Sequence, residues 1–309
     1  MANCKEFYFP SSDGRTNIHA VEWTPEGAPV GVYQIAHGVS EYALRYAPFA
    51  EFLCSKGFAV AANDHIGHGL SVAEGAPPLW FGEKDGWTHV VDDMYKLRCM
   101  TREKYPSLPC FLMGHSMGSF LARTYLIRYP GTVDAAVVMG TGQQGALLLA
   151  GGKLAARAIG KKHGFDRFSP AVEKLAFGAY NKPFEPTRTK FDWLSVNTEN
   201  VDAYAADPLC GGDATVGLFF DMLGGIGFIC KPSNVRKMDM DTPVLFISGA
   251  MDPVGGFGVG VSKAYQSFVD AGVKDVSLRL YPGLRHEILN ETEREQVYAD
   301  IWAWVERHM

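Results

Sequence analysis

The stretch GHSMG at residues 114–118 holds the first side chain that could do chemistry, a serine between two glycines. An apolar run, residues 110–113, leads into it, and the following SFLARTYLIRYP offers apolar residues at helical spacing. Strand, sharp turn and helix in that order are the context of G-x-S-x-G, in which a strained turn exposes the serine hydroxyl. The alternative is an ordinary tight turn. The context favours Ser116 as a nucleophile.

A serine hydroxyl becomes a nucleophile at neutral pH only beside a base that a third group orients. The expected chain order is serine, acid, histidine. Of the three histidines that follow Ser116, His286 lies in LYPGLRHEILNE, just past the last predicted strand, whereas His163 lies in an inserted segment and His308 is penultimate. We therefore predict His286 as the base; the alternative is a histidine of a surface loop.

The acid should follow the preceding strand. In VLFISGAMDPVG, Asp252 occupies that place, on a loop marked by proline and glycine. Asp270 and Asp275 lie beyond the next predicted helix and fit less well. The alternative for Asp252 is a helix cap at an ordinary turn. The predicted catalytic set is Ser116, Asp252 and His286.

An attacked carbonyl develops negative charge on its oxygen, and preorganised N–H groups stabilise that charge. One donor should be the backbone N–H of Met117, directly after the nucleophile. The other should come from QIAHGVSEYALRY, after the third predicted strand, with Val39 as the donor. Gly38 would let the backbone turn toward the site.

Other chemical constellations are weaker. His65 and His68 in DHIGHG suggest a metal site, but the sequence offers no third ligand, and we predict no metal. Asp92 and Asp93 form a carboxylate pair, which we place on the solvated face of an amphipathic helix. The chain has no G-x-G-x-x-G and no Walker A loop. We therefore expect no cofactor.

The elements that must position these residues alternate along the chain. Apolar runs rich in strand formers occur at residues 7–10, 18–23, 30–36, 59–63, 110–114, 135–139, 244–247 and 276–281. The first two alternate in polarity and predict an antiparallel hairpin, and the later, continuous runs predict parallel strands covered on both faces. Helical spacing marks residues 85–106 and 292–309. The sequence predicts an α/β fold with an eight-stranded, mostly parallel sheet and helices on both faces.

Residues 142–240 interrupt this alternation with stretches such as GALLLAGGKLAARAIG and VGLFFDMLGGIGFIC. We expect a core of residues 1–141 and 241–309, and a helical cap, 142–240, inserted after the sixth strand. The large apolar side chains of the cap predict an acyl tunnel over Ser116. Glycines 224, 225 and 227 are the expected hinge of that cap.

Composition and charge exclude several classes of protein. The 309 residues are 47% hydrophobic and 20% charged, with a net charge of −5, which provides no basic surface for nucleic acid. The six cysteines show no C-x-x-C spacing, and the N-terminus lacks the basic and apolar regions of a signal peptide. We expect free thiols and a cytoplasmic protein.

Five stretches together resemble the monoacylglycerol lipase and bacterial lysophospholipase family of α/β-hydrolases: HGVSEYALRY, NDHIGHGLS, YPSLPCFLMGHSMGS, GAMDPVG and LYPGLRHEILNE. The resemblance implies the α/β-hydrolase fold and the same catalytic and oxyanion residues. It also implies that Glu41 and Arg45 line the alcohol side of the site. One departure is Ser119, where the family often has a second glycine.

The resemblance and the apolar cap predict a serine carboxylester hydrolase that acts on a monoacyl lipid, either a monoacylglycerol or a lysophospholipid. The expected partner is a small-molecule acyl ester, with transient contact of the cap with a membrane surface. Alternatives are a small-ester esterase, an aminopeptidase, a C–C bond hydrolase or a non-catalytic ligand-binding protein, because a fold does not fix a function.

Overall fold

The structure is a computed structural model that describes residues 2–309. All eight predicted strands form one sheet, in the order β1-β2-β4-β3-β5-β6-β7-β8. β1 pairs antiparallel with β2, β2 antiparallel with β4, and all other neighbours are parallel. The strands are β1 (Asn3–Pro10), β2 (Asn17–Thr24), β3 (Gly31–Ala36), β4 (Phe58–Asn63), β5 (Cys110–His115), β6 (Ala135–Met139), β7 (Val244–Gly249) and β8 (Val276–Tyr281).

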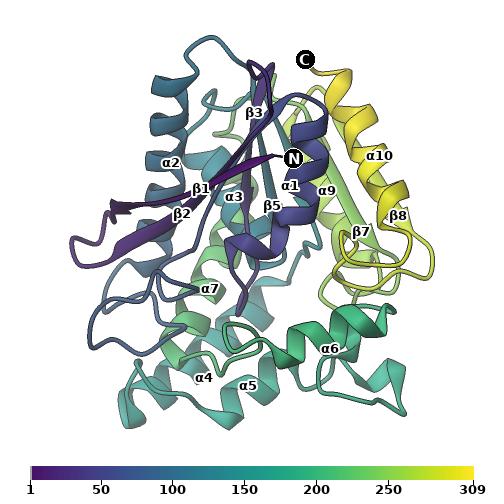
Figure 1. The fold of residues 1–309 in the computed structure, drawn as a ribbon. Coiled ribbons are helices and arrows are strands. Elements are labelled where there is room, and N and C mark those ends of the chain that lie inside the picture. The colour runs from purple at the N-terminus through teal and green to yellow at the C-terminus, as the bar shows by residue number, and fades with distance from the viewer. Residues whose placement is uncertain (1) are drawn as a thin grey trace.

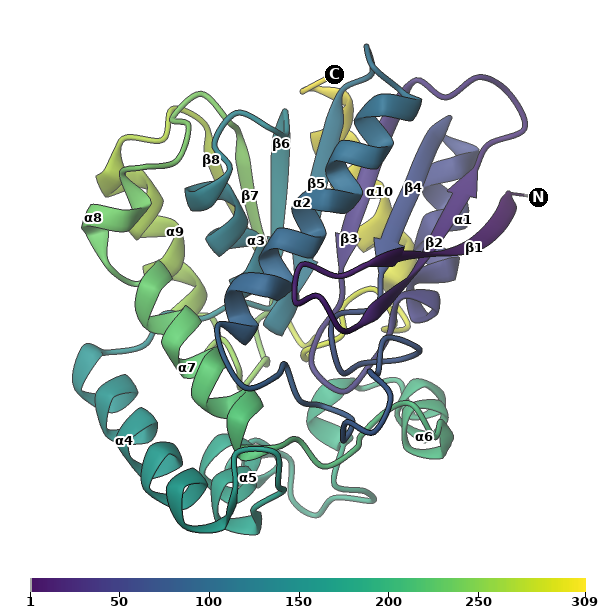
Figure 2. The same cartoon turned by 90° about the vertical axis from the view of Figure 1, so that its left-hand side faces the viewer.

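Helices cover both faces of this sheet, as the continuous apolar strands require (Figures 1 and 2). On one face, α1 (Ala47–Ser55) and α10 (Arg294–Glu306) pack over side chains such as Tyr33 and Phe111. On the other lie α2 (Gly86–Lys104), α3 (Met117–Arg128) and α9 (Val259–Ala271). The predicted α/β-hydrolase architecture is therefore confirmed, and the carboxyl end of β5 delivers Ser116.

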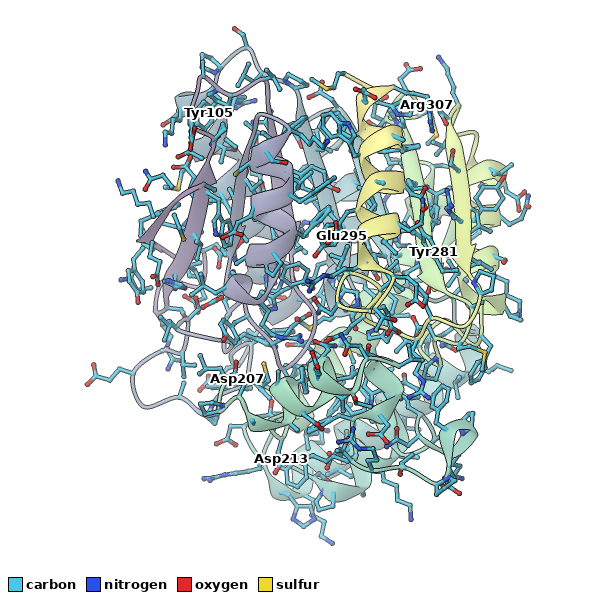
Figure 3. The ribbon with its side chains drawn as sticks, turned by 45° about the vertical axis from the view of Figure 1, so that its right-hand side comes forward. Tyr105, Asp207, Asp213, Tyr281, Glu295 and Arg307 are labelled. Atoms are coloured by element: carbon cyan, nitrogen blue, oxygen red, sulfur yellow. The ribbon has the colours of Figure 1, made fainter. Side chains whose placement is uncertain are left out.

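Residues 142–240 form helices between β6 and β7, and the first of these helices lie beyond the carboxyl ends of the strands (Figures 1 and 2). They are α4 (Ala146–His163), α5 (Pro170–Phe177), α6 (Thr198–Ala206), α7 (Val216–Ile229) and α8 (Pro232–Val235), with short 3-10 turns at Lys182–Phe184 and Asp192–Leu194. The Tyr42 hydroxyl, on the core, donates a hydrogen bond to Asp207 after α6 at 2.7 Å (Asp207 is labelled in Figure 3).

The three glycines of the expected hinge do not interrupt a helix. Gly224, Gly225 and Gly227 all lie inside the continuous helix α7, which packs against α2 and α3 as well as α4. A Cβ at Gly225 would lie 2.1 Å from the indole ring of Trp87 on α2. At this position glycine serves close packing between helices instead of a bend.

The expectation of a solvated carboxylate pair is wrong for Asp93. Asp93 is 1% exposed, and its carboxylate accepts hydrogen bonds from the Ser11 hydroxyl and the Ser12 N–H, both at 2.6 Å. Burial raises the pKa of Asp93 although these bonds oppose the rise. The turn of the N-terminal hairpin covers this face of α2. That contact joins residues 82 positions apart, so helical periodicity alone does not reveal it.

Two further observations concern residues 2–309. The cysteines lie apart as free thiols at positions 4, 54, 99, 110, 210 and 230. Across residues 2–309, no helix combines the length and apolar character needed to cross a bilayer.

Candidate active site

Ser116 lies on a strained turn between β5 and α3. Its φ of 55° and ψ of −122° are values that a non-glycine residue rarely adopts. The flanking glycines explain how the turn fits. A Cβ at Gly114 would lie 2.1 Å from the Gly118 carbonyl oxygen, and one at Gly118 would lie 2.0 Å from the Ala36 carbonyl oxygen. The G-x-S-x-G spacing is therefore a packing requirement of this corner.

The structure brings His286 and Asp252 together. The His286 Nδ1 lies 2.9 Å from Asp252 Oδ2, and the two residues are 2% and 0% exposed. Because an ionised carboxylate only accepts hydrogen bonds, Nδ1 carries the proton. The Ser248 hydroxyl and the Val254 N–H also donate to Asp252, at 3.2 and 2.8 Å, and fix the carboxylate.

The other ring nitrogen of His286, Nε2, has no hydrogen-bond partner among the described residues. His286 and Ser116 line the same cavity. The indole of Trp193, from the 142–240 segment, lies 5.1 Å from the imidazole, centroid to centroid, and covers one side of it. The imidazole is thus oriented by Asp252 and presents an acceptor nitrogen to the cavity.

The rejected candidates lie elsewhere, and none of them lines this cavity. His308 pairs with Asp275 near the C-terminus, at 3.0 Å. Asp270 accepts a hydrogen bond from Gln266 on the exposed side of α9. His163 is an exposed residue at the end of α4.

The two N–H groups expected to stabilise an oxyanion are free. Within residues 2–309, neither the Val39 N–H nor the Met117 N–H has an acceptor in the protein. The Met117 N–H is one of the unpaired donors at the start of α3. Val39 and Ser116 line both cavities described below, and Met117 lines the second. Free backbone donors thus lie beside the strained serine.

Glu41 and Arg45 belong to a buried ionic network. Arg45 donates to Glu41 Oε2 at 2.7 Å and to both oxygens of Glu287, at 2.8 and 2.9 Å. Glu41 Oε1 accepts from the Gly38 N–H at 2.6 Å and lies 3.3 Å from Nδ1 of His115. Glu41 and Glu287 line the cavity, whereas Arg45 lies behind them. The network joins the loop after β3, the serine turn and the histidine loop.

The charges of this network shift its pKa values. Burial alone would raise the pKa of Glu41, but the His115 hydrogen bond and the Arg45 charge lower it. Burial would likewise raise the pKa of Glu287, and Arg45 lowers it. Burial would lower the pKa of His115, yet the adjacent Glu41 raises it. Two buried carboxylates thus stay ionised beside the candidate nucleophile.

Sequence reasoning missed Glu287 and His115 as parts of this network. The sequence signal that could have found them is their position next to predicted catalytic residues, because His115 precedes the serine and Glu287 follows the predicted base. Pairing with Arg45, 242 positions away from Glu287, is not visible in the sequence.

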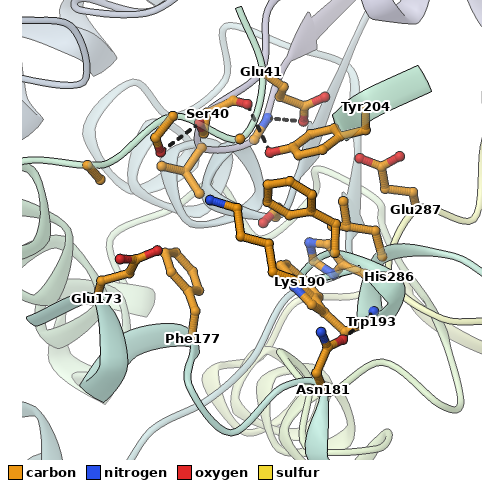
Figure 4. A pocket seen from close by; sticks show the side chains of 18 of the residues that line it. Ser40, Glu41, Glu173, Phe177, Asn181, Lys190, Trp193, Tyr204, His286 and Glu287 are labelled. Carbon is orange, nitrogen blue, oxygen red and sulfur yellow. Dashed lines mark hydrogen bonds between the residues drawn. The ribbon is translucent and has the colours of Figure 1, made fainter. Parts of the chain in front are cut away.

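Two cavities meet at Ser116. The first, about 330 Å³, has mixed polar and apolar walls from both the core and the 142–240 segment (Figure 4). Its polar side chains include Glu41, Glu173, Asn181, Lys190 and Glu287. The second, about 460 Å³, has apolar walls, and its lining includes Phe120, Leu149, Ala155, Phe177, Phe219 and Leu223. The expected apolar space over Ser116 is therefore present, lined by α4, α5 and α7.

His65 and His68 are buried beside His37 and do not form part of either cavity. Residues 2–309 contain no group of three or more His, Cys, Asp or Glu side chains that could hold a metal ion. Burial lowers the pKa of His68 to about 3, so this imidazole is neutral.

Comparisons with known proteins find relatives that span most of this chain. The family model described as serine aminopeptidase S33 matches residues 27–293. A monoacylglycerol lipase from Mycolicibacterium smegmatis is 30% identical, covering 93% of this chain and 92% of the relative. The human monoglyceride lipase is 27% identical over 92% of this chain and 84% of its own length. The crystal structure of a thermostable carboxyl esterase from Bacillus coagulans, in complex with glycerol, covers 98% of both chains with a TM-score of 0.91 and 27% identity.

The family match covers most of the chain, and the relatives span nearly its full length. The predicted family is thereby confirmed: this chain belongs to the α/β-hydrolase family that includes the S33 serine aminopeptidases and the monoacylglycerol lipases, and it is a lipase-like serine hydrolase.

Proposed function

We propose that the protein hydrolyses the ester bond of monoacyl lipids through Ser116, His286 and Asp252. The observation that carries the proposal is the oriented imidazole: Nδ1 of His286 is bound to Asp252, and Nε2 is unpartnered beside the cavity that holds Ser116. A base in this tautomer can take the serine proton.

The proposed reaction has two halves. Ser116 Oγ attacks the ester carbonyl carbon while His286 Nε2 takes the hydroxyl proton of the serine. The resulting oxyanion accepts hydrogen bonds from the N–H groups of Val39 and Met117. The bond to the leaving alcohol breaks, and His286 returns the proton to that alcohol. Water then attacks the acyl carbonyl with His286 as base, the bond to Ser116 Oγ breaks, and the fatty acid leaves as His286 returns the proton to Ser116.

The two cavities divide the substrate. We assign the acyl chain to the apolar cavity and the alcohol to the more polar one. Glu41 would form a wall of the alcohol side, and Arg45 would act by holding Glu41 in place. Residues 142–240 would be the cap that closes both cavities over Ser116. The names of the relatives, monoacylglycerol lipases and a phospholipase from Bacillus subtilis, support this substrate class.

The mouth of the apolar cavity supports contact with a lipid surface. Leu147, Leu148 and Leu175, which line it, are 91%, 68% and 73% exposed. We propose that these leucines of α4 and α5 touch the membrane surface when the protein takes up substrate. Binding to lipid vesicles should fall when Leu147 and Leu148 are replaced by Gln, and equal binding of the variant would contradict this contact.

The test is a substrate panel combined with active-site labelling. A fluorophosphonate probe should label the wild-type protein and not Ser116→Ala. The panel contains monoacylglycerols, lysophospholipids, p-nitrophenyl esters and aminoacyl amides, and monoacyl lipids should give the highest kcat/KM. His286→Ala should lose nearly as much activity as Ser116→Ala, because the members act as a unit.

Three results would contradict the proposal. Labelling of Ser116→Ala by the probe would show that Ser116 is not the nucleophile. Higher kcat/KM for aminoacyl amides than for lipid esters would favour a peptidase. Full activity of Asp252→Asn would show that another group orients His286, because the amide should impose the wrong tautomer.

A further inference from the structure

The turn that carries the Val39 N–H is fixed by a histidine that the proposed mechanism does not use. In the trans peptide unit between Gly38 and Val39, the Gly38 carbonyl and the Val39 N–H point in opposite directions. Whatever holds that carbonyl therefore sets the direction of the N–H. This peptide lies against the nucleophile, since a Cβ at Gly38 would be 3.0 Å from Ser116 Cβ.

The imidazole of His37 holds the carbonyl. His37 Nδ1 lies 2.7 Å from the Gly38 oxygen, and no other hydrogen bond within residues 2–309 reaches that oxygen. A carbonyl oxygen only accepts, so Nδ1 carries a proton. On the other side of the ring, the His65 N–H donates to His37 Nε2 at 2.9 Å. Two backbone groups thus fix the tautomer and the orientation of a ring that is 1% exposed.

His37 is also held neutral. Burial lowers its pKa, although the charges of Asp64 and Glu41 oppose the shift. The His65 ring lies 4.1 Å away, centroid to centroid, and burial lowers its pKa as well. A neutral His37 keeps Nε2 available as an acceptor for the His65 N–H.

The rest of the turn is held at separate points. Glu41 accepts the Gly38 N–H, and the Ser40 carbonyl accepts from the Tyr204 hydroxyl at 2.9 Å and the Gly211 N–H at 3.1 Å (Figure 4). Ser40 itself has a φ of 57°. None of these bonds involves the carbonyl that shares a peptide unit with the Val39 N–H.

We propose that His37 is a positioning residue of the oxyanion hole: its Nδ1–H fixes the Gly38 carbonyl and thereby aims the Val39 N–H at the substrate oxygen. The inference rests on the proposed function, because it assigns Val39 as an oxyanion donor. Loss of one such donor lowers kcat on the order of 100-fold. Substrate binding in the ground state should change little, so KM should stay nearly constant.

Two isosteric variants separate this role from simple packing. In His37→Asn the side-chain amide can occupy the place of Nδ1, whereas in His37→Gln it reaches the place of Nε2. We expect His37→Ala and His37→Gln to lose about 10- to 100-fold in kcat. We expect His37→Asn to retain activity within a few-fold of the wild type.

His68 supplies the matched control. It is equally buried, and its Nδ1 also bonds a carbonyl, that of Ile66 at 3.0 Å, which is not part of the oxyanion peptide. His68→Ala should lower the melting temperature without a comparable loss of kcat. The kinetic comparison uses a p-nitrophenyl ester and variants that remain folded by circular dichroism.

Equal kcat for His37→Asn and His37→Gln would overturn the inference, and so would a loss in His68→Ala as large as in His37→Ala. An NMR spectrum of the imidazole nitrogens gives a readout without substrate, in which His37 should show a protonated Nδ1 and a bare Nε2. The opposite tautomer would refute the inference even if hydrolysis is observed. Failure of the wild type to hydrolyse any ester would instead refute the proposed function.

Discussion

The acyl-chain dependence of hydrolysis tests how the apolar cavity is used. The cavity encloses about 460 Å³ beside Ser116, with walls from α4, α5 and α7. Each methylene transferred from water into such a space contributes up to about 0.8 kcal/mol. If that contact persists in the transition state, kcat/KM should rise about fourfold per methylene. Four added methylenes, from a C4 to a C8 ester, should lower the activation free energy by about 3 kcal/mol, which raises kcat/KM on the order of 100-fold.

The assay measures kcat/KM for esters of one alcohol with acyl chains from C2 to C16. A steep rise followed by a plateau is expected, and the plateau marks the chain length at which the cavity is full. Ala155→Phe places a ring in the cavity wall, so the plateau should move to shorter chains and long esters should lose at least about tenfold, the equivalent of two methylenes. Short esters should be unaffected.

The control is Ala150→Phe on the same helix, because Ala150 is exposed and does not line the cavity. It should leave the whole profile unchanged. A monotonic fall from the acetate ester upward would refute the assignment of this cavity to the acyl chain. The same profile in both variants would show that the apolar residues only pack α4 against its neighbours.

The remaining predictions concern charge, stability and thiols. Burial raises the pKa of Asp221 to about 6 from 3.8, so the folded chain keeps a proton that the unfolded chain has released, and stability falls by about 2–3 kcal/mol as pH rises from about 4 to 6. Asp221→Asn should therefore stabilise the protein in urea at pH 8 but not at pH 4, and equal effects at both pH values would contradict this. Asp93→Ala leaves the Ser11 hydroxyl without its acceptor and should cost about 1–3 kcal/mol in the same assay; no change would mean that the hairpin contact contributes nothing. The Lys190 ammonium lies over the Phe191 ring, 4.8 Å from its centroid, and has no carboxylate partner among residues 2–309. Its charge is therefore free to contact a phosphate headgroup, and Lys190→Met should lower kcat/KM for lysophospholipids relative to monoacylglycerols about two- to fivefold. An unchanged ratio would exclude headgroup contact. Thiol titration in denaturant without reductant should detect six thiols, and fewer would indicate a disulfide.

The fold and the catalytic candidates were accessible from the sequence because their signals are local. Ser116 is recognisable in the sequence by its flanking glycines, which the turn requires for packing. Asp252 and His286 follow apolar strands, and parallel strands bring their carboxyl ends to one edge of the sheet. The chain order of the elements was therefore sufficient to predict which side chains meet.

Other features depend on contacts between distant segments. Asp93 is buried because the N-terminal hairpin covers α2, and Gly225 is small because Trp87 packs against it. Periodicity reports which face of a helix is apolar, but it does not report what lies over the polar face. For the same reason, the family resemblance placed Glu41 and Arg45 near the site, but nothing in the sequence linked Arg45 to Glu287.

The attachment of the 142–240 segment has a consequence for exchanging parts between relatives. The segment leaves from β6 and returns at β7, which are adjacent, and Met139 pairs with Ile247 across them. Because these strands are parallel, the segment leaves at the carboxyl end of β6 and returns to the amino end of β7, where Val244 pairs with Ala136. A foreign insert must therefore end in a crossover helix such as α7, and only the part before that helix could vary in length at little entropic cost.

The helices of the segment differ in how closely they pack against the core. Helix α7 packs into the core, with Gly225 against Trp87, whereas α4, α5 and α6 lie farther out (Figures 1 and 2). A chimaera that replaces residues 146–206 and keeps everything from Thr215 onward would retain both the core packing and the acid–base side chains. Selectivity for acyl chain and headgroup would then be transferable between family members as a module, while the reaction chemistry stays with the recipient.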